Sequence, residues 1–151
     1  MSKPSCLAKN RSHGFSLVEM VIVISIVGVL MLIAIPRAER ALARSNIVGA
    51  RVGFGNLFHR ARTAAIQSRR PTSINFASGT AFVTSGGGTI FGSSTLALHF
   101  QTSYGVTATA SASSLTIQPT GLVTTGTPFV LELVRGEVRD TISITGYGRI
   151  E

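Results

Sequence analysis

Residues 15–36 read FSLVEMVIVISIVGVLMLIAIP, and Glu19 is the only ionisable side chain within this stretch. As a helix, the 21 residues before Pro36 would rise about 31 Å, which matches the hydrocarbon core of a bilayer. A secretory signal has a shorter apolar run of about 7–15 residues and ends at a small-residue cleavage site, whereas here Pro36-Arg37 follows. We therefore predict a transmembrane helix in which Glu19 is functional, since a carboxylate inside a membrane is costly.

The residues around the start of this helix carry a family resemblance. Residues 9–19 read KNRSHGFSLVE, which resembles the leader junction of type IV prepilins and type II secretion pseudopilins: a short basic leader ending in Gly, then Phe, then Glu four residues later. Pro36 stands where members of that family have a proline that weakens the long helix. The resemblance implies that a prepilin peptidase cleaves between Gly14 and Phe15 on the cytoplasmic side and methylates the new amine of Phe15.

The resemblance also implies roles for Glu19 and for the membrane. Glu19 would neutralise the amine of a neighbouring subunit, or its own, as the helix leaves lipid for the filament, and a carboxylate and an ammonium attract strongly in a low dielectric. The protein would cross the inner membrane once, contact its lipid, hold its C-terminal domain in the periplasm and enter a pilus or pseudopilus. Charge alone does not choose this orientation, because Lys and Arg flank both ends of the span.

The chain divides into a leader (residues 1–14), the transmembrane helix (15–36), an amphipathic stalk helix (37–70) and a β-rich domain (71–151). The formal net charge of +8 comes from the first half, because residues 37–70 contain eight arginines and one acid, Glu39. In the stalk, apolar residues recur at spacings of three and four, which predicts one buried helix face. This stripe consists of Ile47, Ala50, Phe54, Leu57, Phe58, Ala61 and Ala65. Gly49, Gly53 and Gly55 predict local bending or melting of this helix.

A row of arginines lies beside that stripe, within an arc about 60° wide at 100° per residue. Three roles fit such a row: a solvated face, contact with acidic groups of adjacent subunits or lipid head groups, and contact with nucleic-acid phosphates. Aromatic residues are not interleaved with the arginines, which disfavours the last role. The candidate contacts for an anionic partner are Arg40, Arg44, Arg51, Arg62, Arg69 and, near the C-terminus, Arg149.

After Pro71 the sequence alternates short β-branched runs with turn residues. We predict strands at residues 73–77, 81–84, 96–101, 106–110, 114–118, 129–135 and 141–145, with a turn or loop at residues 86–88. The predicted fold class is α+β, with the long helix packed on a small antiparallel sheet domain. Residues 115–121 (LTIQPTG) and 146–150 (GYGRI) resemble the GspH/FimT branch of minor pilins.

Catalysis is not expected. Neither a metal-binding cluster of His and Cys nor a Gly-x-Ser-x-Gly elbow occurs in the chain, so no cofactor or metal is predicted. The lone cysteine, Cys6, lies in the leader. The interpretation is a minor pilin or pseudopilin, a structural subunit of a type II secretion pseudopilus or a type IV pilus tip, whose partners are prepilin peptidase and other pilin subunits.

Two alternatives remain open. The first is a DNA-binding minor pilin for natural transformation that uses Arg149 and the arginine row. DNA is the less favoured partner, because the basic residue that follows the Gly-Arg pair in some DNA-uptake members is replaced here by Ile150 and Glu151. The second alternative is a protein unrelated to pili whose apolar segment is only a membrane tether.

Overall fold

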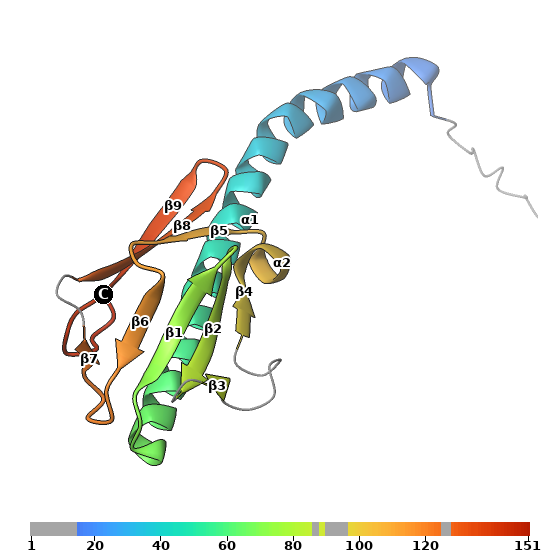
Figure 1. Cartoon of the computed structure of the whole chain (residues 1–151). Helices are drawn as coiled ribbons and strands as arrows, with labels where there is room; N and C mark the ends of the chain where they lie inside the picture. Colours follow the sequence, from blue (N-terminus) through green and yellow to red (C-terminus); the bar gives the residue numbers. More distant parts are fainter. Residues whose placement is uncertain (1–14, 86–87, 90–96, 125–127) are drawn as a thin grey trace, which may run out of the picture. The chain divides into compact units, whose positions relative to one another are not determined.

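The computed structural model describes residues 15–85, 88–89, 97–124 and 128–151. The chain divides into two compact units, an N-terminal unit (Met1–Ala38) and a globular unit (Glu39–Glu151). Helix α1 runs from Leu17 to Ser68 and so begins in the first unit and ends in the second (Figure 1). All other elements belong to the globular unit.

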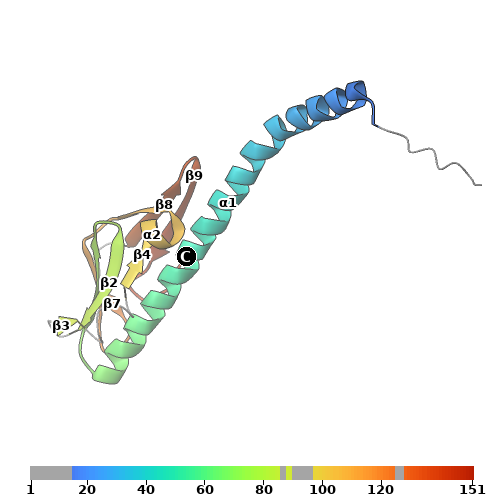
Figure 2. The ribbon, with the colours of Figure 1, turned by 90° about the vertical axis from the view of Figure 1, so that its right-hand side faces the viewer.

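Within the globular unit, α1 lies along one face of the strands (Figure 2). Its buried face consists of Ala43 and the seven residues of the predicted stripe, so the helical periodicity is confirmed. The helix is unbroken at Gly49, Gly53 and Gly55, and the melting predicted there is wrong. The helix ends at Ser68, where Arg69 adopts a left-handed conformation (φ 52°) and Pro71 follows, a combination that stops helices.

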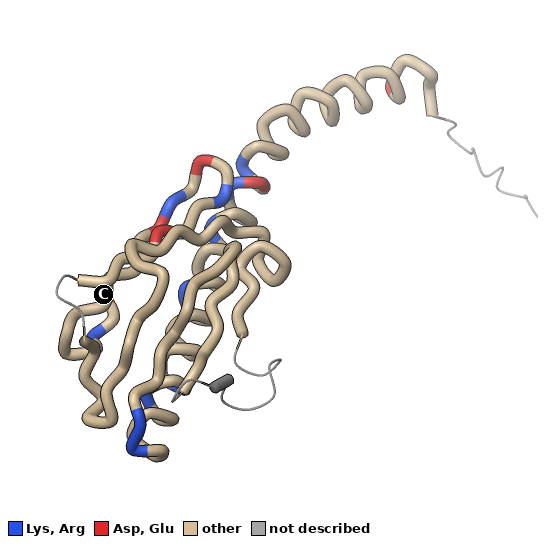
Figure 3. The backbone as a smooth tube through the Cα atoms, in the orientation of Figure 1, with Lys and Arg blue, Asp and Glu red and all other residues tan. Residues whose placement is uncertain are grey.

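In the N-terminal unit, α1 is apolar and exposed. From Leu17 to Ile35 its only charge is Glu19 in the first turn (Figure 3). Every described side chain of this unit is exposed, and the helix is long and apolar enough to cross a membrane. Pro36 lies inside the helix and removes one main-chain hydrogen bond there, because proline has no N–H.

The strands form two antiparallel sheets. The first has the order β3-β2-β1-β6-β7, with β4 also paired to β2, and the second has the order β5-β8-β9. The bounds in the first sheet are β1 Thr72–Ala77, β2 Thr80–Ser85, β3 Gly88–Thr89, β4 Ala97–His99, β6 Ser114–Ile117 and β7 Val123–Thr124. The bounds in the second sheet are β5 Thr107–Ala110, β8 Phe129–Arg135 and β9 Val138–Ile144. A short helix, α2 (Phe100–Tyr104), links β4 to β5.

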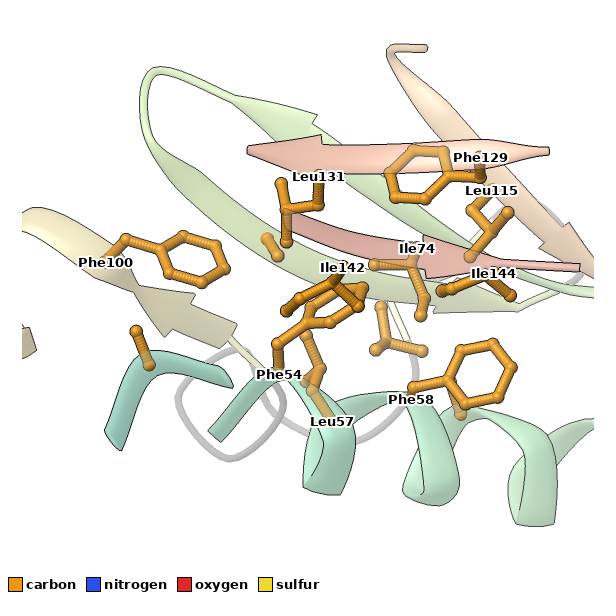
Figure 4. Packing of buried hydrophobic residues seen from close by; sticks show 14 of the residues in the cluster. Phe54, Leu57, Phe58, Ile74, Phe100, Leu115, Phe129, Leu131, Ile142 and Ile144 are labelled. Atoms are coloured by element: carbon orange, nitrogen blue, oxygen red, sulfur yellow. The ribbon is translucent and has the colours of Figure 1, made fainter. Parts of the chain in front are cut away.

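One hydrophobic core joins α1 to both sheets (Figure 4). The ring centroid of Phe54 on α1 lies 6.0 Å from that of Phe76 on β1 and 6.4 Å from that of Phe100 on α2. Phe76 in turn stacks on Phe129 of β8, with centroids 5.0 Å apart. Aromatic pairs at these separations add to the stability that burial provides, so the first sheet, the second sheet and the helix stabilise one another. The α+β fold class is confirmed.

The predicted strand at residues 96–101 is only partly correct. Ala97–His99 form β4, but Phe100 begins α2, and residue 96 lies outside the described residues. The amide of Phe100 donates to the Gly79 carbonyl (3.1 Å), and its own carbonyl accepts from Val106 (3.3 Å). These two bonds and the burial of the ring turn the chain from the first sheet to the second, a tertiary constraint that periodicity does not contain.

Two other predictions need adjustment. Strand β9 begins at Val138 rather than at residue 141, because Gly136 (φ 59°) makes a two-residue turn that pairs Arg135 with Val138. Of the glycine run at residues 86–88, Gly88 starts β3 and pairs with Ser85, whereas residues 86 and 87 lie outside the described residues. The sequence does not predict the short strands β3 and β7, because a strand of two residues is too short to show an alternation of apolar and polar side chains.

Candidate assembly site

The first group of candidate residues lies at the start of α1. Gly14 lies outside the described residues, and Phe15 is the first residue described. Glu19 sits in the first turn of the helix, where the positive end of the helix dipole favours a carboxylate. Its side chain is exposed among the apolar side chains of Leu17, Val18 and Met20, and the described residues provide it with no ion-pair partner. In an apolar environment this carboxylate would need a cation from elsewhere.

Two arginines of the predicted row bind acids of the β8–β9 hairpin. Arg51 Nη1 donates to both carboxylate oxygens of Asp140, at 3.1 Å (Oδ1) and 3.0 Å (Oδ2). Arg40 Nη2 lies 3.4 Å from Glu137 Oε2, and both of these side chains are mostly exposed. These contacts attach α1 to the hairpin, and Figure 3 shows basic positions of α1 beside acidic positions of the hairpin. In the sequence, acids stand close together at positions 132, 137 and 140, and their charge is opposite to that of Arg40 and Arg51.

Arg62 is held against two turns near the C-terminus. A Cβ at Gly121 would lie 2.9 Å from Arg62 Nε, and a Cβ at Gly148 would lie 3.6 Å from Arg62 Nη1. Both glycines have positive φ (81° and 73°), a conformation that glycine adopts without strain. These two glycines, which lie in the segments 115–121 and 146–150 that resemble the GspH/FimT branch, therefore make room for a guanidinium from α1. Sequence reasoning placed Arg62 in the exposed row and did not find this packing.

The remaining arginines of the set are exposed. Arg44 and Arg69 have no carboxylate partner among the described residues. Arg149 Nε lies 3.5 Å from Glu151 Oε1, and the Arg149 amide donates to Thr145 Oγ1 at 3.3 Å. Arg149 thus has a local acidic partner two residues away. The structure therefore places the six arginines in different surroundings: three contact acids of the same chain, one packs on glycines and two face outward.

A polar cluster that the sequence did not reveal fastens α2 to α1. Arg135 donates from its guanidinium to the Tyr104 carbonyl, and it also donates to the side-chain oxygen of Asn46 when the Asn46 amide is oriented with that oxygen toward Arg135. The Tyr104 ring lies on the two helical glycines: a Cβ at Gly49 would be 3.1 Å from its Cε1 and a Cβ at Gly53 would be 2.7 Å from its Oη. These glycines were predicted to weaken α1, but they provide the space for Tyr104.

The described histidines and acids do not form a metal site. Within residues 15–151, leaving out the undescribed segments, no group of three or more His, Cys, Asp or Glu side chains could hold a metal ion. His59 is exposed on α1, and His99 Nδ1 lies 3.1 Å from Thr80 Oγ1.

Two family models match parts of this chain. Residues 9–35 match the prokaryotic N-terminal methylation motif, and residues 53–148 match the family described as type II transport protein GspH. No curated protein matches the chain.

Solved structures support the fold. The chain is similar to the type IV minor pilin FimU of Pseudomonas aeruginosa in two crystal forms. For the P65 form, the sequence identity is 18% and the TM-score is 0.54, and the match covers 68% of this chain and 89% of the FimU chain. The P21 form is 19% identical with a TM-score of 0.55 and covers 77% and 91%. Because a family match over residues 53–148 spans more than half of the chain, this protein belongs to the GspH family and is a GspH/FimT-like minor pilin or pseudopilin.

Proposed function

We propose that the protein is an assembly subunit of a type II secretion pseudopilus or of a type IV pilus tip, matured by a prepilin peptidase. The observation that carries the proposal is the exposed apolar part of α1, Leu17 to Ile35, which contains a single carboxylate, Glu19, and lies within the matched methylation motif. The globular unit behind it has a completed core. The exposed apolar helix is therefore the part of the chain that requires a partner, first lipid and then other subunits.

Maturation would create the cation that Glu19 lacks. Hydrolysis of the peptide bond between Gly14 and Phe15 leaves a carboxylate on Gly14 and an ammonium on Phe15, and methylation replaces one N–H hydrogen while the charge is kept. In lipid or in a filament core, an unpaired carboxylate and an unpaired ammonium are each strongly unfavourable. Pairing Glu19 with the terminal ammonium of a neighbouring subunit removes both penalties and sets the axial register between the two helices.

The same proposal accounts for the membrane topology and for the position of Pro36. Cleavage on the cytoplasmic side places Gly14 inside and the globular unit in the periplasm, with one crossing of the inner membrane. Pro36 weakens the helix where it leaves the bilayer. Arg44 and Arg69, which have no carboxylate partner among the described residues, are the two candidate arginines left for acidic groups of adjacent subunits.

The test is removal of the carboxylate. Glu19→Ala should leave membrane insertion intact and reduce incorporation into filaments to trace levels, because losing one partner of a buried ion pair costs about 3–5 kcal/mol. Glu39→Ala, which removes an exposed acid of the globular unit, is the matched control and should assemble normally. Incorporation is measured by immunoblotting of purified filaments against the membrane fraction. Normal assembly of Glu19→Ala would refute the proposed role of this residue.

A further inference from the structure

An open groove lies between β5 and the turn that joins β1 to β2. Its volume is about 330 Å³, and it is lined by residues 76–80, residues 108–110, Phe100, Ala112 and Ser113. The aromatic side chains of Phe76 and Phe100 belong to the core or pack against it. No lining residue carries a charge. We refer to this feature as the β5 groove.

The main chain of β5 presents hydrogen-bonding groups beside this groove that pair with no other described strand. Strand β5 is the edge of its three-stranded sheet, and Ala108 and Ala110 lie opposite Leu133 and Leu131 of β8. The Ser111 amide donates to the Val130 carbonyl at 2.8 Å. Because hydrogen-bonded pairs alternate along an antiparallel ladder, the amides and carbonyls of Thr107 and Thr109 face β8. Those of Ala108 and Ala110 face away from β8, on the outer edge of the sheet.

This edge lacks the usual protection. Natural edge strands are blunted by lysine, proline, a bulge or a covering segment, whereas β5 reads Thr-Ala-Thr-Ala, and no other described strand pairs with its outer side. The outward amide and carbonyl groups of Ala108 and Ala110, which no described strand pairs with, recur about 6.8 Å apart along the strand and match the repeat of another extended chain. Small Ala side chains at these positions allow a second backbone to approach. The edge is therefore chemically suited to a polypeptide strand.

We propose that the β5 groove receives an extended, uncharged segment of a neighbouring filament subunit, which adds to the edge of β5 as a further strand. Strand addition of this kind takes its affinity from main-chain hydrogen bonds and its specificity from pockets for alternate side chains; here a small apolar side chain of the guest would enter the groove beside Phe76. The uncharged lining argues against lipid head groups and nucleic acid as occupants. The inference rests on the proposed function, since it requires assembly with other subunits.

The first test alters the main-chain donor of β5. Ala108→Pro removes an amide that faces away from β8, so the β5–β8 pairing is kept, and incorporation into filaments should fall about tenfold because one hydrogen bond of the added strand is lost and the proline ring obstructs the guest backbone. Ala108→Val keeps the amide and is the matched control, which should incorporate normally. Normal incorporation of Ala108→Pro would overturn the proposal.

The second test does not depend on how well the proline variant folds. In a Cys6→Ser background, Ala110→Cys reports on the groove and Thr141→Cys reports on the exposed surface of β9. Maleimide labelling of the Ala110→Cys variant should be about tenfold slower in filaments than in unassembled membrane protein, with a much smaller change for Thr141→Cys. Equal rates in both states, or equal protection at both positions, would overturn the proposal. If the unaltered protein never enters filaments, the proposed function itself fails; if it enters with an unprotected groove, only this inference fails.

Discussion

Gly53 and Gly55 show how differently one residue type acts at two positions of the same helix. A Cβ at Gly53 would lie 2.7 Å from Tyr104 Oη and 3.3 Å from Leu98 Cδ1, whereas a Cβ at Gly55 would meet nothing within 4 Å. Gly55→Ala should raise the free energy of unfolding by about 0.5–1 kcal/mol through helix propensity. Gly53→Ala should lower it by about 1–2 kcal/mol, because crowding of Tyr104 outweighs that gain. Urea unfolding of the detergent-solubilised protein, followed by near-ultraviolet circular dichroism, measures both; a Gly53→Ala variant as stable as Gly55→Ala would contradict the packing described.

Thr72 is a second residue whose surroundings determine its contribution to stability. It is fully buried at the start of β1, and its hydroxyl has no hydrogen-bond partner among the residues that the structure describes. Thr72→Val should be neutral or stabilise the fold by about 1 kcal/mol, because an unsatisfied buried hydroxyl is unfavourable. The control is Thr116→Val, which removes a hydroxyl that lies 3.0 Å from Ser73 Oγ and should cost about 0.5–1 kcal/mol. The same unfolding measurement applies, and marked destabilisation by Thr72→Val would show that the hydroxyl has a partner.

At the scale of elements, the attachment of α1 to the β8–β9 hairpin depends on one of its two ion pairs. The side chains of Arg51 and Asp140 are 40% and 31% exposed and form two hydrogen bonds, whereas those of Arg40 and Glu137 are 65% and 81% exposed. Water screens the outer pair more. Double-mutant cycles should give a coupling energy of about 0.5–1 kcal/mol for Arg51–Asp140 and about zero for Arg40–Glu137. Equal couplings, or a larger one for the outer pair, would be inconsistent with this geometry.

The elements also show how far the sequence alone determines this fold. The buried stripe of α1 and strands such as β8 could be predicted from the spacing of apolar residues along the chain. This spacing has a period of 3.6 in a helix and of 2 in a strand. Helix α2 could not be predicted, since Phe100 is turned by contacts with Gly79 and Val106 that form only in the folded chain. For the same reason the arginine row could be located on the helix, but its division among Asp140, Glu137, the two glycines and solvent could not, because it depends on which loops lie opposite each turn.

At the scale of the whole molecule, the two units have opposite relations to water. The globular unit buries a core made by one helix face and two sheets, while the described residues of the N-terminal unit leave their apolar side chains exposed. Exposed apolar surface of this extent marks a membrane or protein contact. A chain built this way combines a folded domain with an apolar helix that needs a partner, which agrees with the proposed transfer from a bilayer into a filament.

The most direct test of this account is the mass of the N-terminal peptide of protein isolated from cells that contain an active prepilin peptidase. We predict that the chain begins at Phe15 and carries one added methyl group on its terminal nitrogen, while the same protein from cells lacking the peptidase begins at the leader. A chain that still begins at Met1 in cells with the active enzyme would contradict the central claim, because Phe15 would then carry no ammonium for Glu19 to bind.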